Sequence, residues 1–372
     1  MYNTFILIVT FYFSQIISRF FKVNKIKIAI LFIFRTIICL TYIPIAEYKG
    51  WDAFGYYDYA FKAPPGFKGT KLIYAISRFI QNYLHVDIYS LTFIFSFIGI
   101  IGCIAYISNI ENLTRNADKR IKFLAELIIF LPTLNIWTSA IGKDAITFTC
   151  LNLIIFSFLK IKNRSLTLLL SCLIISLIRP FIGIVLFLGL AITFIRNINL
   201  PFIYKLLIRL LLAGGIILVN SINFEFLKLE NLLNYNLLEI IDYYSERTDI
   251  GENAIDPNSL NIPMKIFSFM FRPLFIDAYG SYQLLMSFEN MILILFVLYT
   301  FKKIWKTFKF QRLIMNPLSF FSIFYIPITW FFYSTTMMNL GTANRYKLMI
   351  VPILIPFLLF LSQDSKKTPL KI

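Results

Sequence analysis

Apolar runs of membrane-spanning length recur from one end of this chain to the other, and they restrict its fold more than any other feature. Of the 372 residues, 58% are hydrophobic and 15% are charged, too few charges to cover a water-facing core. The sequence therefore predicts an all-α, polytopic transmembrane helix bundle that forms a single integral membrane domain, residues 1–372. Its spans, about eleven, are expected at residues 4–20, 27–46, 88–107, 121–138, 145–160, 165–178, 181–196, 206–222, 283–301, 313–334 and 347–362.

The basic residues orient this bundle, because Lys and Arg accumulate in the cytoplasmic loops of membrane proteins. Alternate loops hold 22 of the 36 basic residues but only three of the 19 acids. We therefore expect these loops and the C-terminus in the cytoplasm and the N-terminus outside. Two charges remain inside spans, Arg35 and Glu126, and we expect them to pair within the bundle.

Two long loops fall on the outer side, at about residues 47–87 and 223–282, each with an amphipathic stretch predicted to be helical. The first stretch is Lys71–Leu84, expected along the membrane interface, and the second covers residues 223–247. The cytoplasmic connections are short and basic, with no Walker motif and no room for a nucleotide-binding domain. The net charge of +17 belongs to these loops, so we expect no nucleic-acid partner. His85 is the only histidine, and the four cysteines lie in apolar segments without metal-type spacing, so no metal and no cofactor is expected.

The segment after the second span, GWDAFGYYDY, places Asp52 and Asp58 among aromatic residues at the membrane edge. A carboxylate can accept the proton of an attacking sugar hydroxyl, and Trp51 can stack on a sugar face while it anchors at the interface. Asp52 and Asp58 are therefore the candidate catalytic residues. The alternative is an ordinary aromatic belt with loop acids.

The segment PTLNIWTSAIGKD forms a short outer turn that contains Trp137 and ends on Lys143 and Asp144. Lys143 suits a lipid-linked phosphate, and Asp144 either supports it or only caps the following helix. Arg179 precedes Pro180 between the two shortest spans, which could also form one re-entrant unit. Its guanidinium either binds phosphate oxygens or extends to lipid head groups.

Two further outer segments, FRPLFID and GTANRYK, supply Arg272 and Arg345. Together with Arg179 they make three guanidiniums on separate outer turns, a set that suits a diphosphate. Asp277, Glu289 and Tyr346 lie in or near these segments and are supporting candidates, as are Trp51, Trp137 and Asp144.

The ordered set GWDAFGYYDYAF, PTLNIWTSAIGKDAITF, LIRPFIG, FRPLFIDAYGSYQLLMSFENMILI and GTANRYKLMIVP resembles bacterial polysaccharide repeat-unit polymerases of the Wzy type, which include exopolysaccharide polymerases. These are multi-span enzymes similar in shape to lipid-phosphate-dependent glycosyltransferases. The likeness covers most of the chain, through short and degenerate motifs.

The resemblance implies glycosyl transfer at the outer face of the cytoplasmic (inner) membrane. A growing glycan on undecaprenyl diphosphate would pass to a sugar hydroxyl of another lipid-linked repeat unit, in a surface polysaccharide such as a capsule. The implied partners are this lipid-linked glycan, the lipid bilayer and a chain-length regulator. Carried onto this sequence, the resemblance gives the base as Asp52 or Asp58 and the diphosphate ligands as Arg179, Arg272, Arg345 and Lys143. The chain departs from the related ligases in lacking a well-placed histidine.

Two other functions fit the same features. One is a glycosyltransferase that takes a single sugar from a lipid monophosphate. The other is a transporter or flippase of lipid-linked oligosaccharides, although transporters usually carry their polar residues near the bilayer midplane.

Overall fold

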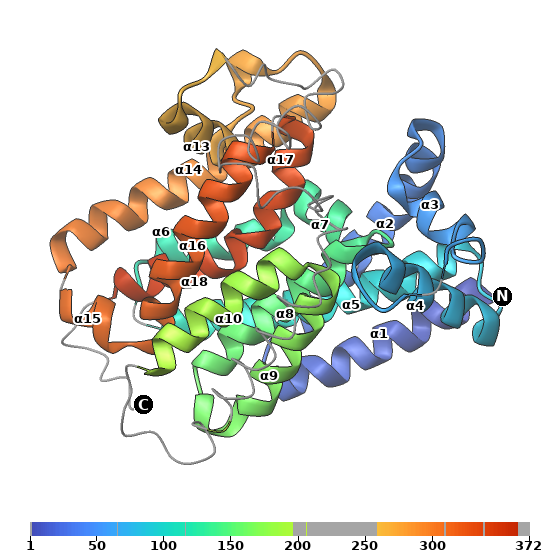
Figure 1. Cartoon of the computed structure of the whole chain (residues 1–372), viewed down its shortest axis with the longest axis horizontal. Coiled ribbons are helices and arrows are strands. Elements are labelled where there is room, and N and C mark those ends of the chain that lie inside the picture. The colour runs from blue at the N-terminus through green and yellow to red at the C-terminus, as the bar shows by residue number, and fades with distance from the viewer. Residues whose placement is uncertain are drawn as a thin grey trace, which may run out of the picture. The chain divides into compact units, whose positions relative to one another are not determined.

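A computed structural model of the chain describes residues 2–64, 66–115, 117–195, 206, 259–308, 310–337 and 339–363 (Figure 1). Their regular structure is all helical, with no strand in these ranges, which confirms the predicted all-α class. The helices are α1 (Tyr2–Phe21), α2 (Lys25–Lys49), α3 (Asp52–Asp58), α4 (Gly69–Leu84), α5 (Ile88–Leu113), α6 (Lys119–Leu127), η1 (Ile128–Phe130), α7 (Pro132–Ser139), α8 (Lys143–Phe158), α9 (Ile161–Ile178), α10 (Pro180–Ile195), α13 (Ile262–Phe271), η5 (Phe275–Asp277), α14 (Ser281–Thr307), α15 (Phe310–Met315), α16 (Pro317–Thr336), α17 (Leu340–Tyr346), η6 (Lys347–Met349) and α18 (Val351–Leu361).

Five of the described helices are long and apolar enough to cross a membrane: α1, α2, α5, α14 and α16. Two bent helix pairs raise this number to seven if each pair is one span. The chain thus has the transmembrane-helix character that its composition predicts, whereas the predicted number of spans and their orientation stay predictions. The eighth predicted span, residues 206–222, and the helix expected in residues 223–247 lie outside the described residues, apart from Leu206.

Two predicted spans are broken. The one expected at residues 121–138 bends by 42° where α7 begins at Pro132, and the last bends by 58° between Met349 and Val351. Proline explains the first break, because Pro132 has no N–H to donate to the preceding turn. Arg179 alone separates α9 from α10, which are two distinct helices.

Helix α13 was not predicted, since its ten residues lie in what looked like a long outer loop. Its start is nevertheless encoded locally. The side chain of Asn261 accepts a hydrogen bond from the Met264 N–H at 3.0 Å, and Pro263 lies in the first turn. Both are typical signals of a helix N-terminus.

The described helices group into two compact units. The first takes in the chain up to Asn116 together with Ile129–Gly183, and the second takes in Ala117–Ile128 and the described part of Ile184–Leu370. The prediction of one integral membrane domain is not tested by this grouping.

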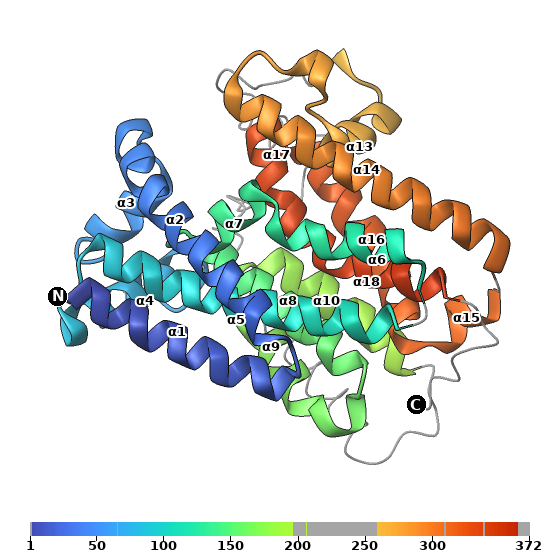
Figure 2. The ribbon, with the colours of Figure 1, turned by 180° about the vertical axis from the view of Figure 1, so that it is seen from behind.

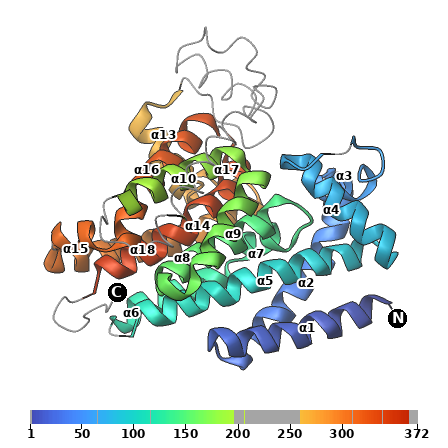
Figure 3. The same ribbon diagram turned by 60° about the horizontal axis from the view of Figure 1, so that its bottom comes forward.

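In the first unit α5 packs against α1, α2, α7 and α8, and α8 packs against α9. The start of α1 meets the start of α5, where Asn3 donates to the Asp87 carboxylate at 2.9 Å. Figures 2 and 3 show α3 and α4 gathered at this same end, beside the N-terminus. The end of the unit at the N-terminus therefore holds α3 and α4 together with Asp87.

Helix α4 confirms the helix predicted within residues 71–84 and extends it to Gly69. Its buried side chains are Ile73, Ser77 and Gln81, while Phe79 and Tyr83 face outward at 62% and 71% exposure. This one-sided burial is that of an amphipathic helix. Its location at the membrane interface stays a prediction.

The break before α7 has a polar partner. Asn135 is fully buried, and its amide nitrogen donates to the carbonyls of Ile129 at 2.8 Å and Leu131 at 2.9 Å. Backbone carbonyls freed at a broken helix must find such partners away from water. Asn135 therefore holds the broken span in its bent form.

Replacing Asn135 by leucine keeps the side-chain volume but removes these hydrogen bonds. We expect the free energy of unfolding to fall by about 1–3 kcal/mol. Thermal unfolding of the detergent-purified protein measures it. Asn82→Leu, at an exposed position on α4, is the matched control. Equal melting temperatures for the two variants would contradict a supporting role for Asn135.

Candidate functional site

Trp51 and Trp137 come together in the first unit. Trp51 precedes α3 in an extended conformation, and its ring centre lies 5.8 Å from that of Trp137 on α7 and 5.5 Å from that of Tyr42 on α2. The end of α2, the start of α3 and the distant α7 therefore meet in one aromatic cluster. The cluster fixes the start of α3, which begins at Asp52.

Asp52 and Asp58 are both exposed, at the first and last residues of α3. Six residues of helix separate their backbones by about 9 Å along the axis. A single hydroxyl group would thus contact one of them at a time, so they are alternatives rather than a pair. Helix α3 is tied to α4 by Gln81, which donates to the Tyr57 carbonyl at 3.2 Å.

Lys143 and Asp144 open α8, directly after Gly142. Gly142 has a φ of +155°, and a Cβ there would come within 3.3 Å of the Tyr56 ring, so this tight turn favours glycine. The turn places both charged residues in the first helical turn. Lys143 occupies the first helical position rather than the cap.

The cap of α8 is Gly142 rather than Asp144, and the Asp144 carboxylate in the first turn accepts a hydrogen bond from Arg179 in a short ion pair. The side chains of Asp144 and Arg179 are only 3% and 10% exposed. Arg179 therefore points into the unit and does not extend to lipid head groups. Breaking a buried pair of this kind leaves one charge uncompensated, which is strongly destabilising.

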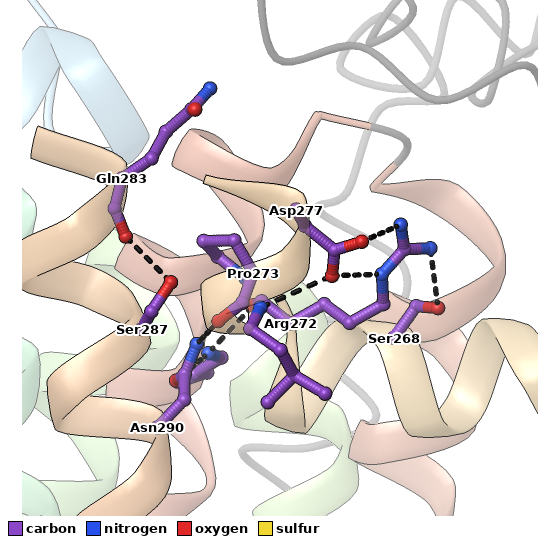
Figure 4. Close-up of polar contacts among 9 residues, drawn as sticks. Ser268, Arg272, Pro273, Asp277, Gln283, Ser287 and Asn290 are labelled. Carbon is purple, nitrogen blue, oxygen red and sulfur yellow. Dashed lines mark hydrogen bonds and ion pairs between the residues drawn. The ribbon is translucent and has the colours of Figure 1, made fainter. Parts of the chain in front are cut away.

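In the second unit Arg272 and Asp277 form a second ion pair (Figure 4). Arg272 follows α13, and its Nε and one terminal nitrogen donate to the two carboxylate oxygens of Asp277 at 2.8 and 2.9 Å. Asp277 also accepts from the Leu274 N–H at 3.1 Å. These hydrogen bonds, above all those from Arg272, lower the pKa of Asp277, and they raise the pKa of Arg272. The guanidinium is thus held side-on by its own carboxylate.

Next to this pair lies a buried polar cluster that joins Asn290 and Lys347 to Glu289, one of the predicted supporting residues. Asn290 on α14 donates to the Pro273 carbonyl at 2.9 Å, as Figure 4 shows. Lys347 donates to the Asn290 side chain at 2.6 Å and to the Arg272 carbonyl at 3.3 Å. Glu289, 4% exposed, interacts electrostatically with Lys347. Lys347 is not among the predicted site residues, and its burial depends on partners from other segments, Arg272 and Asn290.

Arg345 and Tyr346 lie at the end of α17, two residues and one residue before Lys347. Helix α17 packs against α13, which ends beside Arg272, and the Tyr346 ring centre lies 4.9 Å from that of Tyr333. The second unit therefore contains Arg272, Asp277, Glu289, Arg345 and Tyr346 of the candidate set. Arg179 belongs to the first unit, so the convergence of the three arginines stays a prediction.

Within the described ranges, no group of three or more His, Cys, Asp or Glu side chains could hold a metal ion.

Arg35 does not form the predicted pair with Glu126. It donates to neutral groups of the first unit, whereas Glu126 forms an ion pair with Lys122 on α6 at 3.8 Å.

Comparison with protein-family models, with curated proteins and with solved structures gives no match for this chain. The candidate site is therefore interpreted from its own residues.

We expect Asp277→Asn to destabilise the second unit by roughly 1–3 kcal/mol at pH 7, because the Arg272 hydrogen bonds to a carboxylate are lost. The pKa of the Asp277 carboxyl group is lower in the folded protein than in the unfolded chain, where it is near 3.8. The ion pair therefore stabilises the fold fully at pH values above 3.8, and this contribution disappears as the pH falls through the pKa of the folded state. The difference in melting temperature between wild type and variant should therefore shrink from pH 7 to pH 3. Asp118→Asn controls for the loss of one negative charge elsewhere. A difference that stays constant with pH would contradict the pair.

Proposed function

We propose that this chain is a glycosyltransferase of the cytoplasmic membrane that polymerises undecaprenyl-diphosphate-linked oligosaccharide repeat units into a surface polysaccharide. The proposal includes the orientation predicted from loop charge, with the N-terminus and the reacting groups outside and the C-terminus in the cytoplasm. It includes about eleven spans, a lipid-linked glycan substrate and a partner that regulates chain length.

The arrangement of Arg272 is the observation that carries this proposal. Asp277 occupies Nε and one terminal nitrogen, while the other terminal nitrogen contacts, among the residues that the structure describes, only the Ser268 hydroxyl, at 3.5 Å. The outer edge of the guanidinium therefore keeps N–H groups in a planar array that matches phosphate oxygens. Asp277 fixes the direction of that edge, and such preorganised donors stabilise charge that develops during a reaction.

In the proposed reaction an acceptor sugar hydroxyl attacks the anomeric carbon of the donor glycan. A new carbon–oxygen bond forms, the bond to the diphosphate breaks, and the hydroxyl proton passes to Asp52 or Asp58. The diphosphate leaves with the negative charge of the broken bond. Arg179, Arg272 and Arg345, with Lys143, would stabilise that charge.

Arg272→Ala and Arg345→Ala should each leave the protein in the membrane yet abolish long-chain polymer, so that single-repeat glycan accumulates. Arg179→Ala should abolish polymer as well, but it also lowers stability, because it leaves the buried Asp144 carboxylate without Arg179. Arg→Lys at the same positions keeps the charge but loses the planar donors, and we expect partial activity. Arg120→Ala, at an exposed position on α6, is the matched control. The readout is the glycan ladder of membranes supplied with lipid-linked repeat units. Normal glycan ladders in all three alanine variants would contradict the proposal that these arginines bind the diphosphate.

The base is tested separately, with Asp52→Asn and Asp58→Asn. One of the two should lose polymer synthesis by about 100-fold or more, the usual contribution of a general base, while still binding donor. Full synthesis in both variants would remove α3 from the mechanism. Activity with a monophosphate-linked sugar, but not with the diphosphate-linked repeat unit, would favour the other glycosyltransferase class. Movement of lipid-linked glycan across vesicles without transfer would favour a transporter.

A further inference from the structure

Arg35 is a charged residue that the proposed chemistry does not use. It lies on α2, a candidate membrane span, and its side chain is completely buried. A charge at such a place is costly unless its surroundings compensate it, so its contacts indicate its role.

The contacts come from two other helices. From α7, the guanidinium reaches the Asn135 side chain at 2.9 Å and the Thr138 hydroxyl and carbonyl at 2.8 and 2.7 Å. From α5, it reaches the Ser96 carbonyl at 3.2 Å. All these acceptors are neutral, so oriented dipoles rather than a carboxylate stabilise the charge. Arg35 therefore joins three helices at one point.

Gly99 on α5 makes room for this arrangement. A Cβ at Gly99 would collide with the Arg35 guanidinium and with the Thr138 carbonyl. The close approach of α5, Arg35 and α7 thus needs the missing side chain, and it is the reason for a glycine in the middle of this helix.

Thr138 is the important contact, because it belongs to the last turn of α7. Carbonyls in the last turn of a helix have no partner within it, and Arg35 supplies one for Thr138. Trp137, which contacts Trp51, precedes Thr138 directly. After Ser139 the chain turns through Gly142 into Lys143 and Asp144.

We propose that Arg35 is a positioning residue that fixes the end of α7. It sets Trp137 against Trp51, and it sets the turn that leads into Lys143 and presents Asp144 to Arg179. Its effect on catalysis rests on the proposed glycosyl transfer, whereas its effect on the geometry does not.

The test uses the full-length protein labelled with 5-fluorotryptophan. Its four tryptophans, Trp51, Trp137, Trp305 and Trp330, give fluorine NMR signals that single Trp→Phe variants assign. Gly99→Ala keeps Arg35 but displaces it, and Arg35→Lys keeps the charge but loses the planar fork. We expect both variants to shift the signals of Trp51 and Trp137 and to leave that of Trp305 in place. Thr36→Val, on the same helix as Arg35, is the control and should shift none.

Polymer synthesis by Gly99→Ala and Arg35→Lys should fall by roughly 10-fold to 100-fold, the usual cost of a misplaced catalytic group. If neither variant folds, Thr138→Val removes one acceptor at constant volume and should shift the Trp137 signal by itself. An unmoved Trp137 signal in every folded variant overturns the proposal. If the wild-type protein makes no polymer, the proposed function fails, but the fluorine signals still decide the role of Arg35.

Discussion

In a segment surrounded by hydrocarbon, every backbone polar group must be satisfied within the protein, and this requirement shapes the chain throughout. Long helices meet it by themselves. Where a proline interrupts a helix, a side chain takes over. The Asn135 side chain donates to the carbonyls of Ile129 and Leu131 before Pro132, and the Asn290 side chain donates to the carbonyl of Pro273. The breaks are therefore where polar side chains collect, and the candidate site is built from them.

The buried and partly buried cations are compensated in two ways. Arg179 and Arg272 each have a carboxylate of their own unit, whereas Arg35 and Lys347 rely largely on amide, hydroxyl and carbonyl oxygens. A carboxylate partner fixes a guanidinium and also neutralises it. A shell of dipoles fixes the cation but leaves its charge in place, so it can stabilise a helix end as Arg35 does at Thr138.

Local pattern is enough to predict most of the long helices and the segments that carry Asp144, Arg179, Arg272 and Asp277. It cannot predict which partner each charge takes, because the partners lie far away in the sequence. Arg35 and Asn135 are 100 residues apart, and Lys347 and Asn290 are 57 apart. The expectation that Arg35 would pair with Glu126 came from treating charges alone as partners, whereas neutral oxygens satisfy this guanidinium. Helix α13 was missed because its signal, Asn261 before Pro263, is short and lies in a long loop.

The pairing of Arg272 with Asp277 also bears on turnover under the proposed function. A bare arginine would hold a lipid diphosphate tightly, and a product anchored in the bilayer cannot escape by dilution into water. An arginine already neutralised by its own carboxylate holds the departing anion more weakly. The same contact that aims the guanidinium would therefore speed release of the spent lipid carrier, so that each round of chain extension can begin promptly.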